Sequence, residues 1–215
     1  MISLDPFYPI VPDTNWLARL LPLGVKLIQL RIKGVTRKTI AAEVAKAVAL
    51  AGAHDCQLVV NDYWLEAIQA GADFVHLGQE DLAAADLKAI RAAGLRLGIS
   101  THNEQELERA LAAKPDYVAL GPIYETKLKQ MPLAPQGLAR IAEWQSKIAA
   151  ARLPCPLVAI GGITLERAPS VLAAGADSVA VITDIVTNAD PERRARDWLA
   201  ATAPWRNLST GCHQG

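Results

Sequence analysis

The chain is poor in cysteine and in aromatic residues, and it carries no net charge. Its three cysteines, Cys56, Cys155 and Cys212, are odd in number and show no CxxC spacing, so neither a disulfide framework nor a zinc site is indicated. Aromatic side chains make up only 5% of the residues, which argues against an aromatic-rich β-sandwich. Twenty-two basic residues balance 22 acidic ones, so no overall field favours nucleic acid or an anionic membrane as a partner.

Targeting and membrane-spanning segments are also missing from the sequence. The start, Met1 to Pro6, has no basic stretch followed by an apolar one, and no uninterrupted apolar run approaches membrane length. With the unpaired cysteines, these absences predict a soluble cytoplasmic protein. Hydrophobic residues make up 51% of the 215 positions, enough for a substantial core in one large domain or two small ones.

Short β-rich runs alternate with helical patterns along the whole chain. This alternation predicts a parallel sheet with crossover helices. The expected strands cover residues 7–11, 26–32, 57–60, 74–77, 96–99, 117–120, 157–160 and 178–182, and the expected helices include 15–21, 138–150 and 192–201.

Eight βα units of about 27 residues each predict a single-domain α/β fold, the (β/α)8 TIM barrel. We expect the barrel to occupy residues 1–203 and an irregular tail to follow over 204–215. An open doubly wound sheet is the alternative. Against it, no GxGxxG turn opens the first helix and no linker rich in glycine, serine or charge divides the chain.

Polar side chains follow two successive strands. Asn61-Asp62 ends one strand and Gln79-Glu80-Asp81 follows the next, and a barrel brings such residues to one mouth. Two carboxylates, Asp62 and Asp81, beside an amide make a seat for Mg²⁺, which is often held by one or two carboxylates together with substrate phosphates. The alternative is that Asp62 and Asp81 cap the helices that follow them.

Two groups of residues have the chemistry to bind phosphate. Gly161-Gly162 after the seventh strand and Ile182-Thr183 after the eighth lie where barrels frequently bind a phosphate through backbone N–H groups; alone, the two glycines would indicate only a tight turn. The second group contains Arg31, Lys33 and Lys129, of which the first two alternate with Gln29. A metal with several cations suits a diphosphate.

Three further features have open interpretations. The polar segment 121–136, with Lys127, Lys129 and three prolines, is long enough to be a lid. His76 lies within an apolar strand, where a histidine more often lines a core than acts as a base. His102, after Ser100-Thr101, is either a helix cap or a substrate contact.

Six ordered motifs resemble a known family. They are Gln29-Leu30-Arg31-Ile32-Lys33, Asn61-Asp62, the run from His76 to Asp81, Gly98-Ile99-Ser100, Gly121-Pro122 with Thr126 and Lys129, and the run from Ala159 to Ile163. Their order and spacing are similar to those of the thiamine-phosphate synthase family, from about Phe7 to Trp198. The resemblance implies a (β/α)8 barrel that joins 4-amino-2-methyl-5-hydroxymethylpyrimidine diphosphate to 4-methyl-5-(2-phosphoethyl)thiazole, or its carboxylated form, and releases diphosphate.

The resemblance also implies roles for individual residues. It assigns Mg²⁺ to Asp62 and Asp81 and a pyrimidine contact to Ser100. The pyrimidine diphosphate would be held by Gln29, Arg31, Lys33, Asn61 and Lys129, of which Arg31, Lys33 and Lys129 would be the catalytic cations. The thiazole phosphate would be held by Thr126, Lys127, Leu128, Gly161, Gly162, Ile182 and Thr183.

The chain departs from the family pattern in one loop. Where the family usually has Pro-Thr-x-Thr-Lys, this sequence has Glu125-Thr126-Lys127-Leu128-Lys129. An acid thus replaces proline, and Leu128 offers a backbone N–H but no hydroxyl. Thr183 stands where serine is common and keeps the hydroxyl.

Three other functions remain as alternatives. A thiazole tautomerase of related fold should not need Asn61, Asp62 and Asp81 together. A non-catalytic sensor that binds thiamine phosphate finds support only in the altered loop. A Schiff-base aldolase would want a lysine within a barrel strand, and the sequence shows none. The expected partners are small-molecule substrates, with the chain a monomer or a homodimer.

Overall fold

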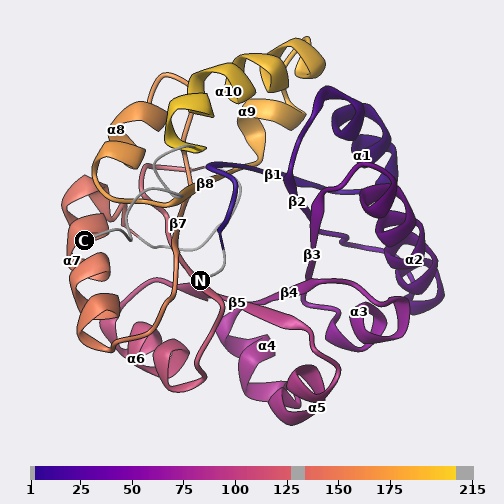
Figure 1. The fold of residues 1–215 in the computed structure, drawn as a ribbon, viewed down its shortest axis with the longest axis horizontal. Coiled ribbons are helices and arrows are strands. Elements are labelled where there is room, and N and C mark those ends of the chain that lie inside the picture. The colour runs from indigo at the N-terminus through magenta and orange to yellow at the C-terminus, as the bar shows by residue number, and fades with distance from the viewer. Residues whose placement is uncertain (1–2, 127–133, 207–215) are drawn as a thin grey trace.

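Eight parallel strands close into a barrel in the order of the sequence. The computed structural model describes residues 3–126 and 134–206. Seen down the barrel in Figure 1, the helices surround the ring of strands. The strands are β1 (Phe7–Val11), β2 (Leu27–Leu30), β3 (Gln57–Asn61), β4 (Phe74–Leu77), β5 (Arg96–Thr101), β6 (Tyr117–Leu120), β7 (Leu157–Ile160) and β8 (Ser178–Val181). Pairing of β1 with β8 closes the ring, so the predicted barrel is confirmed and the open sheet is excluded.

One or more helices follow every strand. They are α1 (Thr14–Leu20), the 3-10 helix η1 (Leu21–Leu23), α2 (Arg37–Ala53), α3 (Trp64–Ala70), α4 (Gln79–Ala84), α5 (Leu87–Ala92), α6 (Glu104–Ala112), α7 (Gly137–Ala150), α8 (Ala168–Ala173), α9 (Thr183–Val186) and α10 (Pro191–Arg206). Within the described ranges, none of these helices has the length and apolar character needed to cross a membrane.

The last helix is longer than the sequence predicted. It continues to Arg206 instead of ending at residue 201, so the expectation of an irregular tail from residue 204 is wrong for residues 204–206. The reason is a distant contact, because Arg206 Nε donates to Asp5 Oδ2 at 2.6 Å. Residues 207–215 of the expected tail lie outside the described residues.

Alternation along the strands divides the core into two layers. Side chains that point outward, such as Val75 and Leu77 of β4, pack under the helices. Inward-pointing side chains fill the barrel and form a second cluster: Leu4, Tyr8, Ile10, Leu27, Val59, Phe74, Tyr117, Ala119, Val158 and Ala180. Gly98 of β5 makes room in this cluster, because a Cβ there would fall within the ring of Tyr117.

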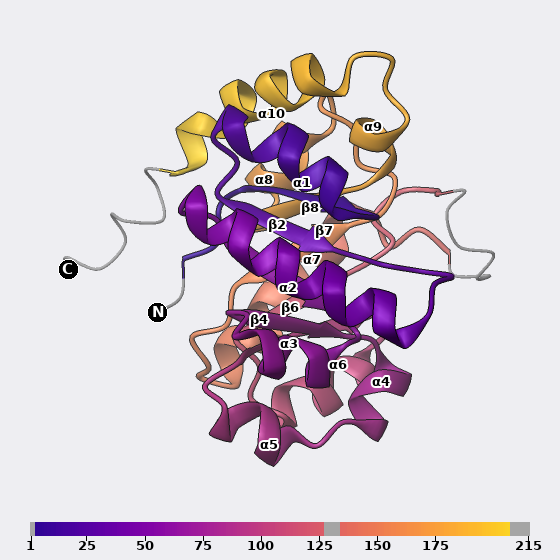
Figure 2. The same cartoon turned by 90° about the vertical axis from the view of Figure 1, so that its right-hand side faces the viewer.

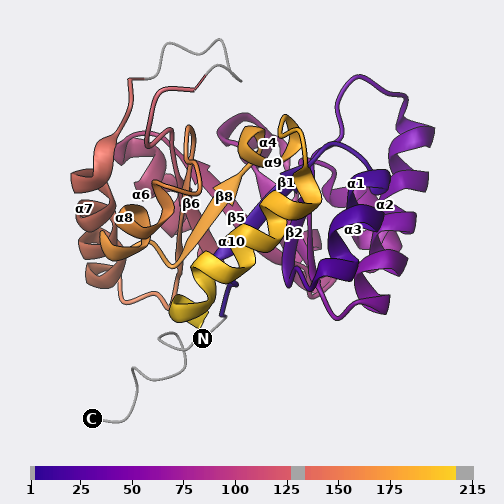
Figure 3. The same ribbon diagram turned by 90° about the horizontal axis from the view of Figure 1, so that it is seen from above.

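The carboxyl ends of the strands all open on one mouth of the barrel. In the side view of Figure 3, α4 and α9, which directly follow β4 and β8, lie at one end of the barrel, while β1 begins and α10 ends at the other. Figure 2 shows α1 and α2 packed lengthwise along the barrel wall. The fold therefore gathers the residues after the strands, and those just inside them, at a single face.

Candidate active site

One cavity of about 870 Å³ occupies the carboxyl-terminal mouth of the barrel, a volume typical of small-molecule sites. Every described residue that the sequence predicted for the site lines it: Gln29, Arg31, Lys33, Asn61, Asp62, Asp81, Ser100, Thr126, Gly161, Gly162, Ile182 and Thr183. The predicted residues Lys127, Leu128 and Lys129 lie outside the described residues, together with the rest of the 127–133 part of the expected 121–136 lid.

Asp62 and Asp81 lie side by side in this cavity. Asp62 follows β3 with a φ of 66°, and its Oδ2 accepts a hydrogen bond from Lys33 Nζ at 2.7 Å. The pKa of Asp81 is raised, first by burial of its carboxyl group and then by the negative charge of Asp62 next to it. The two carboxyl groups therefore share one small volume, and they are not easily ionised at the same time unless a cation is present.

Neither aspartate is a helix cap, so that alternative is excluded. The residue before α3 is Tyr63, and it makes no side-chain cap hydrogen bond. The helix α4 begins at Gln79 after Gly78, earlier than the expected start near Leu82. Asp81 is thus in the first turn of α4, where the positive end of the helix dipole favours a carboxylate.

The two carboxylates suit Mg²⁺ better than they suit a metal whose ligands all come from the protein. Among the described residues, no three His, Cys, Asp or Glu side chains converge on one point, whereas Mg²⁺ commonly takes one or two carboxylates and completes its shell with water and substrate phosphate. The described cavity lining is also rich in acid, with Asp62, Glu80, Asp81, Glu106 and Glu125 against Arg31 and Lys33. An added divalent cation would offset part of this negative charge.

The opposite wall is built from glycines in close contact with the segment after β6. Gly161 and Gly162 have φ values of 100° and 62°, and Tyr124 N donates to Gly161 O at 3.0 Å. A Cβ at Gly162 would collide with the backbone oxygen of Glu125. Within the described residues, the N–H of Gly162 donates to no backbone carbonyl, so it is available to an anion in the cavity.

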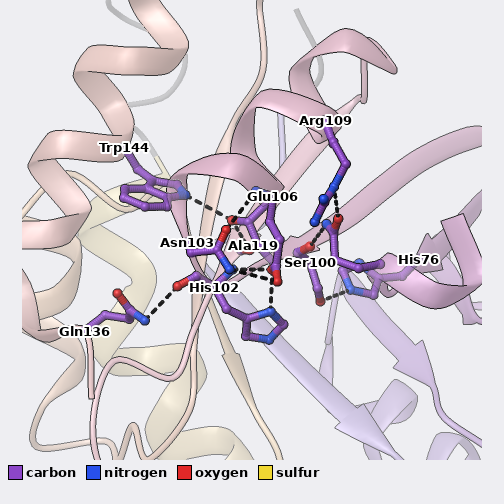
Figure 4. A network of polar contacts seen from close by, with 11 residues as sticks. His76, Ser100, His102, Asn103, Glu106, Arg109, Ala119, Gln136 and Trp144 are labelled. Atoms are coloured by element: carbon purple, nitrogen blue, oxygen red, sulfur yellow. Dashed lines mark hydrogen bonds and ion pairs between the residues drawn. The ribbon is translucent and has the colours of Figure 1, made fainter. Parts of the chain in front are cut away.

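A hydrogen-bonded group on α4, β5 and α6 forms the third side of the cavity (Figure 4). Gln79 Nε2 donates to the backbone oxygen of Ser100 at 2.7 Å, and Arg109 Nε donates to Gln79 Oε1 at 3.1 Å. One residue on, the Thr101 hydroxyl donates to Ala119 O at 3.0 Å. The backbone at Ser100 is therefore held from both sides.

The two histidines of the cavity are both hydrogen-bonded. His76, buried inside the barrel as expected, lies 2.7 Å from the Ser100 hydroxyl through Nε2. His102 is not the cap of α6, since Asn103 is. Instead its ring Nδ1 and its backbone N–H both lie 2.8 Å from Glu106 Oε2, and its carbonyl accepts from Gln136.

Sequence reasoning missed several cavity residues. Tyr8 lines the cavity from β1; its inward position follows from strand alternation, but nothing in an apolar run marks which residue faces a ligand. Glu106 is four residues after His102, a helical spacing that would have indicated the pair. Gln79 and Glu80 were visible as polar residues after a strand but were given no role.

A closed barrel with paired carboxylates at one side of its mouth and a turn of two glycines at the other is typical of one class: barrel enzymes that act on phosphorylated small molecules. The sequence matches the family described as thiamine monophosphate synthase over residues 8–185. The chain therefore belongs to the thiamine monophosphate synthase family, as its motifs predicted.

Curated relatives agree with this membership, and a solved structure shares the fold. The chain is 61% identical to the thiamine-phosphate synthase of Rhizobium etli, over 96% of this chain and 100% of the relative. It is 52% identical to that of Salmonella typhimurium, over 91% and 88% of the two chains. A thiamine phosphate pyrophosphorylase structure from Pyrococcus furiosus superposes with a TM-score of 0.80 at 24% identity, covering 94% of this chain and 96% of that one, which shows the shared fold.

Proposed function

We propose that this chain is a thiamine-phosphate synthase, a transferase that joins 4-amino-2-methyl-5-hydroxymethylpyrimidine diphosphate to 4-methyl-5-(2-phosphoethyl)thiazole, or its carboxylated form. One observation supports this most directly. A single cavity carries Asp62, Asp81, Arg31 and Lys33 on one wall and the Gly161-Gly162 turn with Thr183 on another. It therefore offers one place for a diphosphate and a separate place for a monophosphate.

The proposed reaction needs orientation and charge more than a strong base. The bond between the pyrimidine methylene carbon and the diphosphate oxygen breaks, and its electron pair leaves with diphosphate. The resulting cation is stabilised by the ring amino group and is captured by the lone pair of the thiazole nitrogen. Arg31 and Lys33 hold the leaving diphosphate, while Gly162 and Thr183 hold the thiazole phosphate in line.

The proposed cofactor is Mg²⁺, held by Asp62 and Asp81. Bound there, it would neutralise charge on the departing diphosphate. Asn61, buried at the end of β3 beside Asp62, contributes an amide to the same wall. For Lys127, Leu128 and Lys129 the proposal rests on the family resemblance alone.

We further propose the cytoplasm as the compartment and a monomer or homodimer as the working unit. The two cysteines in the described ranges, Cys56 and Cys155, are free and buried, and burial raises the pKa of each thiol to about 12. Neither is therefore a reactive thiolate at neutral pH.

The test is product formation by the purified chain from both substrates in the presence of Mg²⁺. Thiamine phosphate and diphosphate should appear in equal amounts. Isomerisation of the thiazole phosphate without coupling would instead identify a tautomerase. Tight binding of thiamine phosphate without turnover would identify a sensor.

A further inference from the structure

Five side chains from five strands form one continuous line of hydrogen bonds across the inside of the barrel. Gln29 Nε2 on β2 donates to the Tyr8 hydroxyl on β1 at 2.8 Å, which lies 2.9 Å from the Tyr117 hydroxyl on β6. Tyr117 lies 2.8 Å from His76 Nδ1 on β4, and His76 Nε2 lies 2.7 Å from the Ser100 hydroxyl on β5. We call this line the barrel relay. Its two ends, Gln29 and Ser100, both line the cavity.

Hydrogen counting gives the relay a direction. Both tyrosines keep their hydroxyl hydrogens, because burial raises the pKa of each phenol. In the part of the chain that the structure describes, the Tyr8 oxygen has two partners, and one of them, the Gln29 amide nitrogen, is only a donor. The hydrogen of Tyr8 must therefore go to Tyr117, since a buried donor left without an acceptor costs free energy.

The same counting continues to the other end. Tyr117 accepts from Tyr8, so its own hydrogen goes to His76 Nδ1, which then carries none. The hydrogen of the neutral imidazole is on Nε2 and is donated to the Ser100 oxygen. The hydroxyl hydrogen of Ser100 is left to point to the cavity that Ser100 lines.

We propose that Tyr8, Tyr117 and His76 are positioning residues that polarise the site, so that Gln29 accepts a hydrogen bond from the ligand while Ser100 donates one. The relay couples the two ends, because reversing the Gln29 amide would reverse every bond along the line and turn Ser100 into an acceptor. A 4-aminopyrimidine matches the polarity with its amino donor and its ring-nitrogen acceptors. This last step rests on the proposed function; the direction of the relay does not.

The polarity also makes a prediction about selectivity. A 4-oxopyrimidine diphosphate presents the reverse pattern, a carbonyl acceptor and an N–H donor. We expect the wild-type protein to bind this compound about a hundredfold more weakly than the amino compound, because buried polar groups would be left unpaired. In Tyr8→Phe the Gln29 amide is no longer held by Tyr8 and can turn. That variant should lose about tenfold of this discrimination, while its KM for the thiazole phosphate stays unchanged.

The direction itself is tested on the ligand-free full chain by ¹⁵N NMR of labelled histidine, with the His76 signals assigned by their loss in His76→Gln. We expect His76 Nδ1 to be unprotonated and Nε2 to carry the hydrogen.

The variant Gln29→Glu should reverse this result. At mildly alkaline pH its new carboxylate only accepts hydrogen bonds, so the His76 hydrogen should move to Nδ1. The control Gln57→Glu, at the start of β3, should leave the hydrogen on Nε2. An Nδ1-protonated wild type, or no change in Gln29→Glu, would overturn the proposal.

The selectivity measurement uses Thr202→Val as its matched control, because Thr202 has a buried hydroxyl that donates to Trp198 O at 2.8 Å within α10, away from the relay. Thr202→Val should keep the wild-type preference for the amino compound. Equal discrimination in Tyr8→Phe and wild type would contradict the positioning role. If the protein shows the expected His76 tautomer but no turnover, the proposed function is refuted and the direction of the barrel relay is not. If it turns over substrate but shows the other His76 tautomer, the direction of the relay is refuted and the proposed function is not.

Discussion

Lys33 Nζ lies 2.7 Å from Asp62 Oδ2 at the mouth of the barrel, so without ligand a lysine already neutralises one of the two neighbouring carboxylates. Lys33 therefore competes with any metal for Asp62. It can bind a diphosphate only when another cation replaces it beside Asp62.

Lys33→Met tests this competition. Removing the ammonium group should raise the affinity of the ligand-free protein for Mg²⁺ by about twofold to fivefold, the range of a half-exposed ion pair. It should also lower the rate of diphosphate release by about tenfold or more, since a cation on the leaving group is lost. Titration calorimetry and a diphosphate assay measure the two effects. Lys26→Met is the control, because Lys26 pairs with Asp55 before the start of β2, at the other end of the barrel.

Asp81→Asn separates metal binding from folding. The amide removes a charge that repels Asp62, so the metal-free variant should melt at the same temperature as the wild type or higher. Mg²⁺-dependent product formation should fall by about a hundredfold or more. Asp73→Asn, an exposed aspartate before β4 that pairs with Arg96, should retain activity. Wild-type turnover in Asp81→Asn, or its unfolding, would refute the metal assignment.

Gly162→Ala tests the proposed binding site for the thiazole phosphate. The added methyl group would lie 2.9 Å from Tyr124 Cβ and would collide with Glu125 O, so the segment after β6 must move. We expect the KM for the thiazole phosphate to rise about tenfold, a loss of about 1.4 kcal/mol, while the KM for the pyrimidine diphosphate changes little. Gly71→Ala has a similar positive φ, 68°, but open space around its Cβ; it should show the backbone strain in its melting temperature and normal values of KM.

Glu166 gives the chain a defined dependence of stability on pH. A hydrogen bond from the Thr164 side chain, a backbone hydrogen bond and the contact with Arg194 lower the pKa of Glu166 from 4.5 to about 2. Since the folded value lies below the unfolded one, this stabilisation is present above pH 4.5 and is lost as the pH falls toward about 2.

Urea unfolding at several pH values measures that contribution. Glu166→Gln should be less stable than the wild type at neutral pH, and the difference in free energy of unfolding should disappear as the pH falls through the window from 4.5 to about 2. Glu108→Gln, an exposed glutamate on α6, should show no such convergence. A constant difference across that window would contradict the assignment.

The barrel was predictable because parallel strands buried on both faces appear in the sequence as short apolar runs. The runs at 7–11, 74–77, 117–120 and 157–160 match β1, β4, β6 and β7 to the residue. Asp62 and Asp81 were predictable as a pair for the same reason, since successive strand ends must meet at one rim.

Contacts between residues far apart in the sequence were not predictable. Nothing in either apolar run indicates that the hydroxyls of Tyr8 and Tyr117, 109 positions apart, meet inside the barrel. The end of α10 was missed similarly, because its last turn is held by Asp5 from the start of the chain. Pattern and spacing predicted which elements form, but only closure of the ring decides which inward side chains oppose one another.

The most direct test of the account is diphosphate release by the purified wild-type chain given both substrates, with and without Mg²⁺ and with the thiazole phosphate omitted. We predict release that requires Mg²⁺ and is matched by an equal amount of thiamine phosphate. A metal-replete protein that binds both substrates and releases no diphosphate would contradict it.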